Sequence, residues 1–165
     1  MYLLDTDIVF ELRNAKSGGT DPGLAGWAGG VARASLFISA LTLLELETGV
    51  GRAERRDKIH GLALRAWLDV QVAPAFDGRI LPVDAAVVRR CAQLPHGGGR
   101  DALLAATALE HGLTLVTRNI AAFKATKVKL FNPWGYAPDA ASEDEDWGQA
   151  AKAGSHWLKN IFVRG

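Results

Sequence analysis

Two carboxylates follow the first apolar segment of the chain, with one residue between them. Residues 2–4 are typical of a buried strand, and Asp5 and Asp7 come directly after them. The carboxyl end of a strand in an open α/β sheet faces the ligand crevice, so we expect Asp5 to do chemistry. Thr6 or Asp7 could instead cap a helix through Phe10, whereas a cap is not expected at the last position of an apolar strand.

Three further polar residues, Glu45, Asp101 and Asn119, stand where an expected strand ends or an expected helix begins. Such ends can meet at one edge of a sheet although they are far apart in the sequence. Glu45 lies among leucines, where an unpaired carboxylate would be costly, unless it completes a capping box with Thr42. Asp101 alone could be the N-cap of the alanine-rich helix that follows it. With Asp5, these are the four positions from which a site could be built.

Oxygen ligands without histidine or cysteine indicate a hard divalent cation. Carboxylates and amides suit Mg²⁺ or Mn²⁺, which keep several waters and also bind phosphate. No Cys and His pair in the sequence has zinc spacing, and none of the four histidines has a Ser or Cys partner that composes a credible triad. The reaction that suits such a site is phosphodiester hydrolysis by a metal-activated water.

The composition is that of one globular domain with a sizeable core. The chain has 165 residues, of which 48% are hydrophobic and 22% are charged. The net charge of +1 conceals a basic body, because residues 1–135 hold 16 Lys and Arg against 13 Asp and Glu, whereas residues 139–146 hold five acids and no base. A surplus of this size permits nucleic-acid binding without demonstrating it.

The cellular compartment is indicated by what the sequence contains and lacks. The single Cys91 cannot form an internal disulfide and is interpreted as a small core residue in a reducing cytosol. No segment has the pattern of a signal peptide or the length of a membrane span. We therefore expect a cytoplasmic protein that does not contact the membrane.

Apolar strand patterns alternate with helical ones along the body of the chain. Strands are expected at residues 35–40, 79–83, 113–117 and 128–131 besides the first, with Pro82 favouring an edge position for the third. Helices are expected at residues 42–50, 52–72, 84–94 and 101–112. This alternation predicts an α/β fold with a mostly parallel sheet that is covered on both faces.

Four segments carry a more specific pattern. They are YLLDTDIV at residues 2–9, ISALTLLELETGV at 38–50, RDALLAATALEHGLTLVTRN at 100–119 and KLFNPW at 129–134. In their residues and in their order along the chain, these segments resemble the PIN-domain ribonuclease toxins of the VapC type, and the resemblance covers nearly all of residues 2–134. The resemblance implies a three-layer α/β/α sandwich with a mostly parallel central sheet. It also implies an endoribonuclease that is the toxin of a type II toxin–antitoxin system.

The same resemblance implies the roles of the candidate residues and the partners. Asp5, Glu45 and Asp101 would hold Mg²⁺ or Mn²⁺, and Asn119 would join them in catalysis. Members of the family generally form dimers and cleave RNA, and each is inhibited by a cognate antitoxin encoded alongside it. The expected partners are therefore RNA, a second copy of the chain and the antitoxin, with operator DNA reached only through the antitoxin.

Other residues near these positions are candidates for supporting roles. Thr6, Asp7, Thr117 and Arg118 adjoin the candidate ligands and could support them or contact substrate. The basic candidates for an RNA groove are Arg118, Arg13 and Arg100, followed by Lys124 and Lys127.

The chain departs from the family pattern in two places. Ala122, just before Phe123, stands where many relatives have an acid, so the fourth position depends on the neutral Asn119. We therefore expect one ion in the free protein, because a second would lack an anionic ligand. The second departure is the link between Leu94 and Asp101, which is short and rich in glycine.

Two other functions stay open from the sequence. Asp5-Thr6-Asp7 is similar to the opening of haloacid-dehalogenase-type phosphatases, but no acidic pair follows the strand expected at 113–117. A catalytically weak PIN-like binding scaffold would be favoured if one of the main acids were missing, and none is. We expect residues 1–134 to form the PIN-like nuclease domain and residues 135–165 to form an acidic tail that is flexible or partly of vector origin.

Overall fold

The computed structural model describes residues 1–15, 18–95 and 98–137. Most of the predicted acidic tail, residues 138–165, lies outside the described residues. The strands are β1 (Tyr2–Leu4), β2 (Leu36–Ser39), β3 (Ile80–Leu81), β4 (Thr114–Val116) and β5 (Leu130–Phe131). The α-helices are α1 (Thr6–Arg13), α2 (Pro22–Gly30), α3 (Ala40–Arg56), α4 (Lys58–Trp67), α5 (Ala73–Ala75), α6 (Ala85–Ala92), α7 (Arg100–Glu110) and α8 (Ile120–Phe123). Shorter helical turns are η2 (Arg33–Ser35), η3 (Leu68–Val72) and η4 (Lys124–Thr126).

The strands form one parallel sheet, as the sequence predicted. Within the described residues the order is β3-β2-β1-β4-β5, and every pair is parallel. The strand β3, which Pro82 follows, lies at an edge as expected. From β1 the chain adds β2 and β3 on one side and then β4 and β5 on the other. In such sheets the carboxyl ends of the two central strands flank a crevice, here between β1 and β4.

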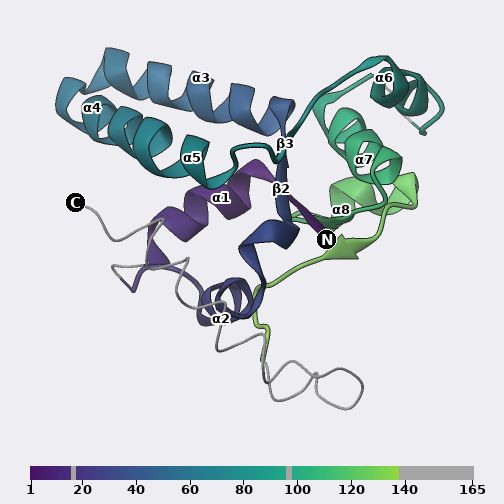
Figure 1. The fold of residues 1–165 in the computed structure, drawn as a ribbon, viewed down its shortest axis with the longest axis horizontal. Helices are drawn as coiled ribbons and strands as arrows, with labels where there is room; N and C mark the ends of the chain where they lie inside the picture. The colour runs from purple at the N-terminus through teal and green to yellow at the C-terminus, as the bar shows by residue number, and fades with distance from the viewer. Residues whose placement is uncertain (16–17, 96–97, 138–165) are drawn as a thin grey trace.

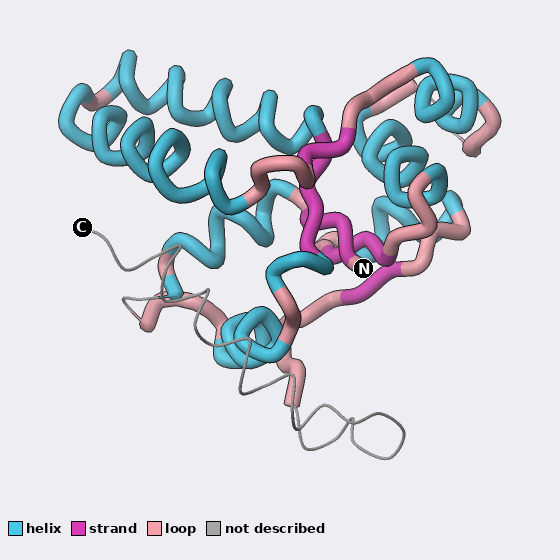
Figure 2. The backbone as a smooth tube through the Cα atoms, in the orientation of Figure 1, coloured by secondary structure: helices cyan, strands magenta, loops and turns pink. Residues whose placement is uncertain are grey.

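Helices cover both faces of the sheet and complete an α/β/α sandwich. Figures 1 and 2 show α1 to α5 on one side of the strands and α6 to α8 on the other. Side chains alternate between the two cores, because successive strand residues point to opposite faces. Leu4 and Val116 join the core under α1 to α5, whereas Leu3 and Leu115 join the core under α7 and α8. Both cores thereby hold β1 and β4 rigidly in place.

The helix expected over residues 52–72 is wrong in its bounds. The helix α3 continues to Arg56, and α4 begins at Lys58 and ends at Trp67. The break is at Asp57, whose carboxylate Oδ1 accepts hydrogen bonds from the backbone amides of Ile59 at 3.0 Å and His60 at 3.1 Å. A side chain that caps a helix in this way starts a new one, although the apolar periodicity on either side of it is continuous.

The structure places the single cysteine and gives the lengths of the apolar helices. Cys91 is buried and lies in the small core between α6 and α7, as expected. Across the described ranges, no helix combines the length and the apolar character that a membrane crossing requires.

The close approach of α4 to α3 depends on Gly61. A Cβ at this position would lie 2.3 Å from the backbone Cα of Glu54, so the helices would have to move apart. We predict that Gly61→Ala lowers the free energy of unfolding by about 1–3 kcal/mol, measured by urea denaturation. Gly26→Ala is the matched control, because Gly26 lies in α2 with open space around it, and alanine there should be neutral or stabilising. Equal stability of Gly61→Ala and the wild type would contradict this account of the packing.

Candidate active site

Asp5 occupies the junction between β1 and α1 at the crevice. Its backbone amide donates to the carbonyl of Val116 at 3.0 Å, which continues the β1–β4 ladder. Its carboxylate Oδ2 accepts a hydrogen bond from the Thr117 hydroxyl at 2.8 Å. The residue is 4% exposed. The strand β4 therefore positions the carboxylate that ends β1.

Asp5 is also the N-cap of α1, which corrects the expectation that Thr6 or Asp7 would serve as the cap. Its Oδ1 accepts a hydrogen bond from the Thr6 amide at 2.7 Å, and Asp7 lies in the first turn. Because β1 ends at Leu4 and α1 begins at Thr6, one residue is both the end of the strand and the cap. Capping and a place in the site are thus compatible at Asp5.

Glu45 lies in the second turn of α3 and is not part of a capping box. The N-cap of α3 is Ser39, whose hydroxyl accepts from the Leu41 amide at 3.2 Å, so the helix begins two residues before Thr42. Thr42 is buried inside the helix and donates to the carbonyl of Leu4 at 3.4 Å. The Thr6 hydroxyl donates a hydrogen bond to Glu45 Oε2. The helices α1 and α3 are therefore linked at the site.

Asp101 lies in the first turn of α7, and the alternative in which it is the N-cap is also wrong. The helix begins at Arg100, with Gly99 as an N-cap that makes no side-chain hydrogen bond. Asp101 is thus left free of a structural role in starting the helix.

The guanidinium of Arg100 brings the three carboxylates together. Its Nη1 lies 2.7 Å from Asp101 Oδ1, and its Nη2 lies 2.9 Å from Glu45 Oε2. It also pairs with Asp5 Oδ1 through Nη2 and with Glu45 Oε1 through Nε. The Arg100 guanidinium therefore joins the residue that follows β1 to residues of α3 and α7, and it lies 95 positions from Asp5 in the chain.

The electrostatics of the site follow from this contact. Burial acts to raise the pKa of Glu45, but hydrogen bonds from Arg100 and Thr6 outweigh it, and the net pKa is lowered. The pKa of Arg100 is raised, first by its hydrogen bond to Glu45 and further by those to Asp101 and Asp5. Both groups are therefore charged at neutral pH.

Asp7 has the opposite shift. Burial raises its pKa, and the charge of the neighbouring Asp5 raises it further. Its Oδ2 accepts from the Arg118 amide at 3.2 Å, whereas its buried Oδ1 has no hydrogen-bond partner among the described residues. Asp7 thus tethers the segment after β4 and does not join the contacts of Arg100.

The donor set fits a hard divalent cation, because it consists of carboxylate oxygens that already converge on a positive group. In the described part of the chain, however, no set of three or more His, Cys, Asp or Glu side chains is arranged as it stands to hold a metal ion. The Arg100 guanidinium separates the carboxylates. An ion and this guanidinium are therefore alternative occupants of the space.

The remaining candidates lie after β4. Thr117 is buried and contacts Asp5, whereas Arg118 is exposed, with its guanidinium carbon 5.3 Å from the ring centroid of Trp134. The Asn119 amide donates to the Thr117 hydroxyl at 3.1 Å. Asn119 is exposed, and its side chain makes no capping hydrogen bond to α8.

The sequence analysis missed the central position of Arg100, which it treated only as a possible RNA contact. The signal for this role was weak, since it consisted of an arginine adjacent to Asp101. The contacts to Asp5 and Glu45 depend on how α1, α3 and α7 approach one another.

Known proteins share both the sequence pattern and the fold. The PIN-domain family model matches residues 2–129. Toxin FitB of Neisseria gonorrhoeae is 34% identical over 81% of this chain and 99% of its own length. The VapC ribonuclease Y4jK of Sinorhizobium fredii is 32% identical over 81% of this chain and 98% of its own length.

A solved structure, FitAB bound to an IR36 DNA fragment, superposes with a TM-score of 0.71 at 31% identity, covering 81% of this chain and 96% of the other. The match extends over the strands and helices that carry Asp5, Glu45 and Asp101. The chain therefore belongs to the PIN-domain family, and its relatives place it among the VapC-type toxins of toxin–antitoxin systems.

Proposed function

We propose that this protein is a Mg²⁺- or Mn²⁺-dependent endoribonuclease and the toxin of a type II toxin–antitoxin system. The observation that carries the proposal is the convergence of Asp5, Glu45 and Asp101 on the guanidinium of Arg100, at the crevice of a parallel sheet. The similarity to a protein named a VapC ribonuclease supports RNA as the substrate class. Asn119 stays a proposed catalytic residue, supported by its position directly after Thr117 and Arg118.

Each residue of the proposed site would have a separate role in catalysis. Asp5, Glu45 and Asp101 would hold the cation, which would supply positive charge to phosphate oxygens and promote ionisation of the attacking water. The Thr117 and Thr6 hydroxyls orient two of the carboxylates by the hydrogen bonds described above. Arg100, once displaced from the carboxylates, would be free to hold a substrate phosphate.

We also propose the partners and the compartment. FitAB bound to a DNA fragment is a structural neighbour, which supports a cognate antitoxin and, through it, operator DNA. A homodimer and a cytoplasmic location are proposed by analogy with the same family.

One alternative keeps a specific observation in its favour. Arg100 partly compensates the charge of the carboxylates in the manner expected of a catalytically weak scaffold, in which the ion pairs would be purely structural. The phosphatase alternative has no such support, since the chain matches the PIN family. Two experiments separate the nuclease from the scaffold.

The first experiment measures cleavage of a labelled single-stranded RNA. We predict cleavage with Mn²⁺ or Mg²⁺, none with EDTA, and near-complete loss in Asp5→Asn, Glu45→Gln and Asp101→Asn, because each substitution removes one anionic ligand. Glu47→Gln is the control, since Glu47 lies on α3 but pairs with Arg65 away from the site. RNA cleavage that persists in EDTA, or in all three variants, would refute the metal-dependent mechanism.

The second experiment tests whether Arg100 and a divalent ion compete. Arg100→Ala should raise Mn²⁺ affinity at least tenfold in calorimetric titration, because one positive charge about 4 Å away opposes the binding of a divalent ion by about 2–8 kcal/mol. In EDTA the same variant should unfold at a lower temperature, because it leaves the carboxylates uncompensated, and Mn²⁺ should restore its stability.

Arg90→Ala is the control for this comparison, because it removes an ion pair with Glu110 outside the site. It should leave Mn²⁺ affinity unchanged and gain no specific stability from the ion. Absence of Mn²⁺ binding by both Arg100→Ala and the wild type would favour the scaffold, whereas equal and measurable affinities would contradict the competition between Arg100 and the ion.

The partner proposal is tested in cells. Expression of the chain should arrest growth, and co-expression of the neighbouring small gene should relieve the arrest, because the antitoxin would block the site. The Asp101→Asn variant, expressed to the same level, should be harmless. Unimpaired growth with abundant wild-type protein would contradict the toxin assignment.

A further inference from the structure

One side of α3 connects the carboxylates to a pair of arginines. Glu45, Gly49, Arg52 and Arg56 follow one another at intervals of four, three and four residues, which places them along one stripe of an α-helix. The rise of the helix puts Arg52 about 10 Å and Arg56 about 16 Å beyond Glu45. Gly49 leaves the stripe without a side chain between Glu45 and Arg52. The stripe therefore begins at the candidate active site and leads away from it.

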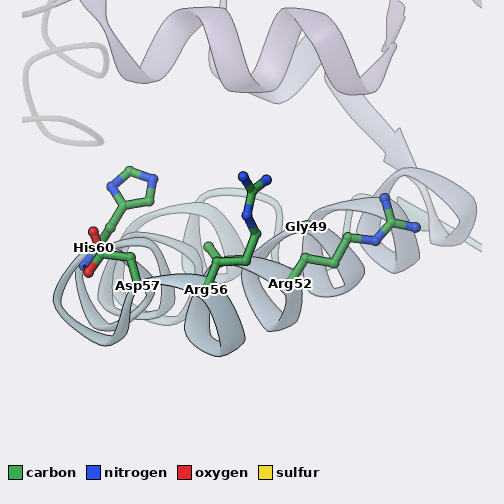
Figure 3. Close-up of a pocket in the computed structure, with 6 residues that line it drawn as sticks. Gly49, Arg52, Arg56, Asp57 and His60 are labelled. Atoms are coloured by element: carbon green, nitrogen blue, oxygen red, sulfur yellow. Dashed lines mark hydrogen bonds between the residues drawn. The ribbon is translucent and has the colours of Figure 1, made fainter.

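A pocket lies along the far half of this stripe. It is lined by Gly49, Arg52, Ala53, Arg56, Asp57 and His60. Figure 3 shows the Arg56 and His60 side chains extending to the same side of the helix pair, with Arg52 next along α3. Both arginines and His60 are exposed, so a ligand can reach them.

Beyond Glu45, the acids of α3 and the arginines of the stripe lie on different sides of the helix and differ in their contacts. The acids Glu47 and Glu54 are bound by Arg65 of α4, with closest N–O distances of 2.6 and 3.2 Å. Within the described residues, neither Arg52 nor Arg56 has an ion pair or side-chain hydrogen bond with a carboxylate. The one acid of the pocket, Asp57, is engaged as the cap of α4. The stripe thus presents two cations that no carboxylate of the described residues pairs with.

The helix α1 runs beside the same stripe. The Thr6 hydroxyl bonds to Glu45, and a Cβ at Gly49 would lie 3.4 Å from the ring of Phe10, so α1 and α3 touch along the stripe. Thr6, Phe10 and Arg13 are spaced by four and three residues and share one side of α1. Arg13, with its guanidinium carbon 5.8 Å from the Trp67 ring centroid, adds a further cation on this side of the domain.

We propose that Arg52 and Arg56, together with His60, bind backbone phosphates of single-stranded RNA to one side of the bond that is cleaved. This inference rests on the proposed ribonuclease function. RNA carries one negative charge on each backbone phosphate, and a row of cations that begins beside a phosphate-cleaving site can contact successive phosphates of one strand. Contacts to phosphates position the strand without reading its bases. Two arginines and a histidine line the pocket against a single carboxylate, and this surplus of positive charge favours RNA over a docked protein helix.

The test compares RNA binding by the wild type and by Arg52→Gln/Arg56→Gln. A labelled 12-nucleotide single-stranded RNA is titrated in EDTA, where no cleavage is expected, and anisotropy is read at several salt concentrations. The double variant should bind at least tenfold more weakly at low salt. Its plot of log affinity against log salt should be shallower by about 1.4, since each lost phosphate contact removes about 0.7. Arg89→Gln on α6, on the other side of the sheet, is the matched control and should bind as the wild type does.

Cleavage of the same RNA with Mn²⁺ gives a second readout. The double variant should have a higher KM with an unchanged kcat, and a dinucleotide, whose only linking phosphate is the one cleaved, should be cleaved equally by both proteins. Circular dichroism and the melting temperature show whether the variant is folded. Equal affinity and an equal salt slope in the two proteins would overturn the inference.

Other outcomes distinguish this inference from the proposed function. A wild-type protein that neither binds nor cleaves RNA would remove both. If the wild type cleaves RNA and the double variant binds it normally, only the phosphate stripe is wrong. If the variant binds RNA normally but escapes inhibition by the co-encoded partner, the stripe docks a protein, and the inference is also overturned.

Discussion

Carboxylates that share one site repel one another unless positive charge lies among them, and the candidate active site depends on the group that offsets this repulsion. In this structure that group is the Arg100 guanidinium, which contacts Asp5, Glu45 and Asp101 at once. Its planar fork of donors suits this, because several carboxylate oxygens can be satisfied in one plane. In the function that we propose, a divalent cation would satisfy the same oxygens, and Arg100 and the ion would then compete.

The sheet topology determines which residues can take part. The strands β1 and β4 lie side by side at the centre of the sheet, so the residues that follow them, Asp5 and Thr117, meet at the crevice. The helices α3 and α7 then begin from the two sides of this crevice and add Glu45 and Asp101. Buried cores on both faces of the sheet fix these elements, as a catalytic site requires of its supports.

The distribution of charge over α3 links the site to the surface around it. Its acids beyond Glu45 are tied to Arg65 of α4, and its stripe of Arg52 and Arg56 is left to face a ligand. The modest net charge of the chain therefore conceals a local surplus on one side of one helix. For a polyanionic substrate the local arrangement matters more than the total, because only nearby charges escape screening by salt.

The sequence by itself determined the alternation of strands and helices and the four polar positions. Both depend on local patterns, namely apolar periodicity and the residue types at its ends. It left Thr42 and Asp101 open as caps and expected none at Asp5, because a cap depends on the residue at which a helix begins, and a shift of one or two residues changes its identity. The break between α3 and α4 at Asp57 was missed because the apolar residues keep a helical spacing on both sides of it. Only the tertiary structure decided that Arg100 lies among three carboxylates, because this depends on how helices far apart in the chain pack at one crevice.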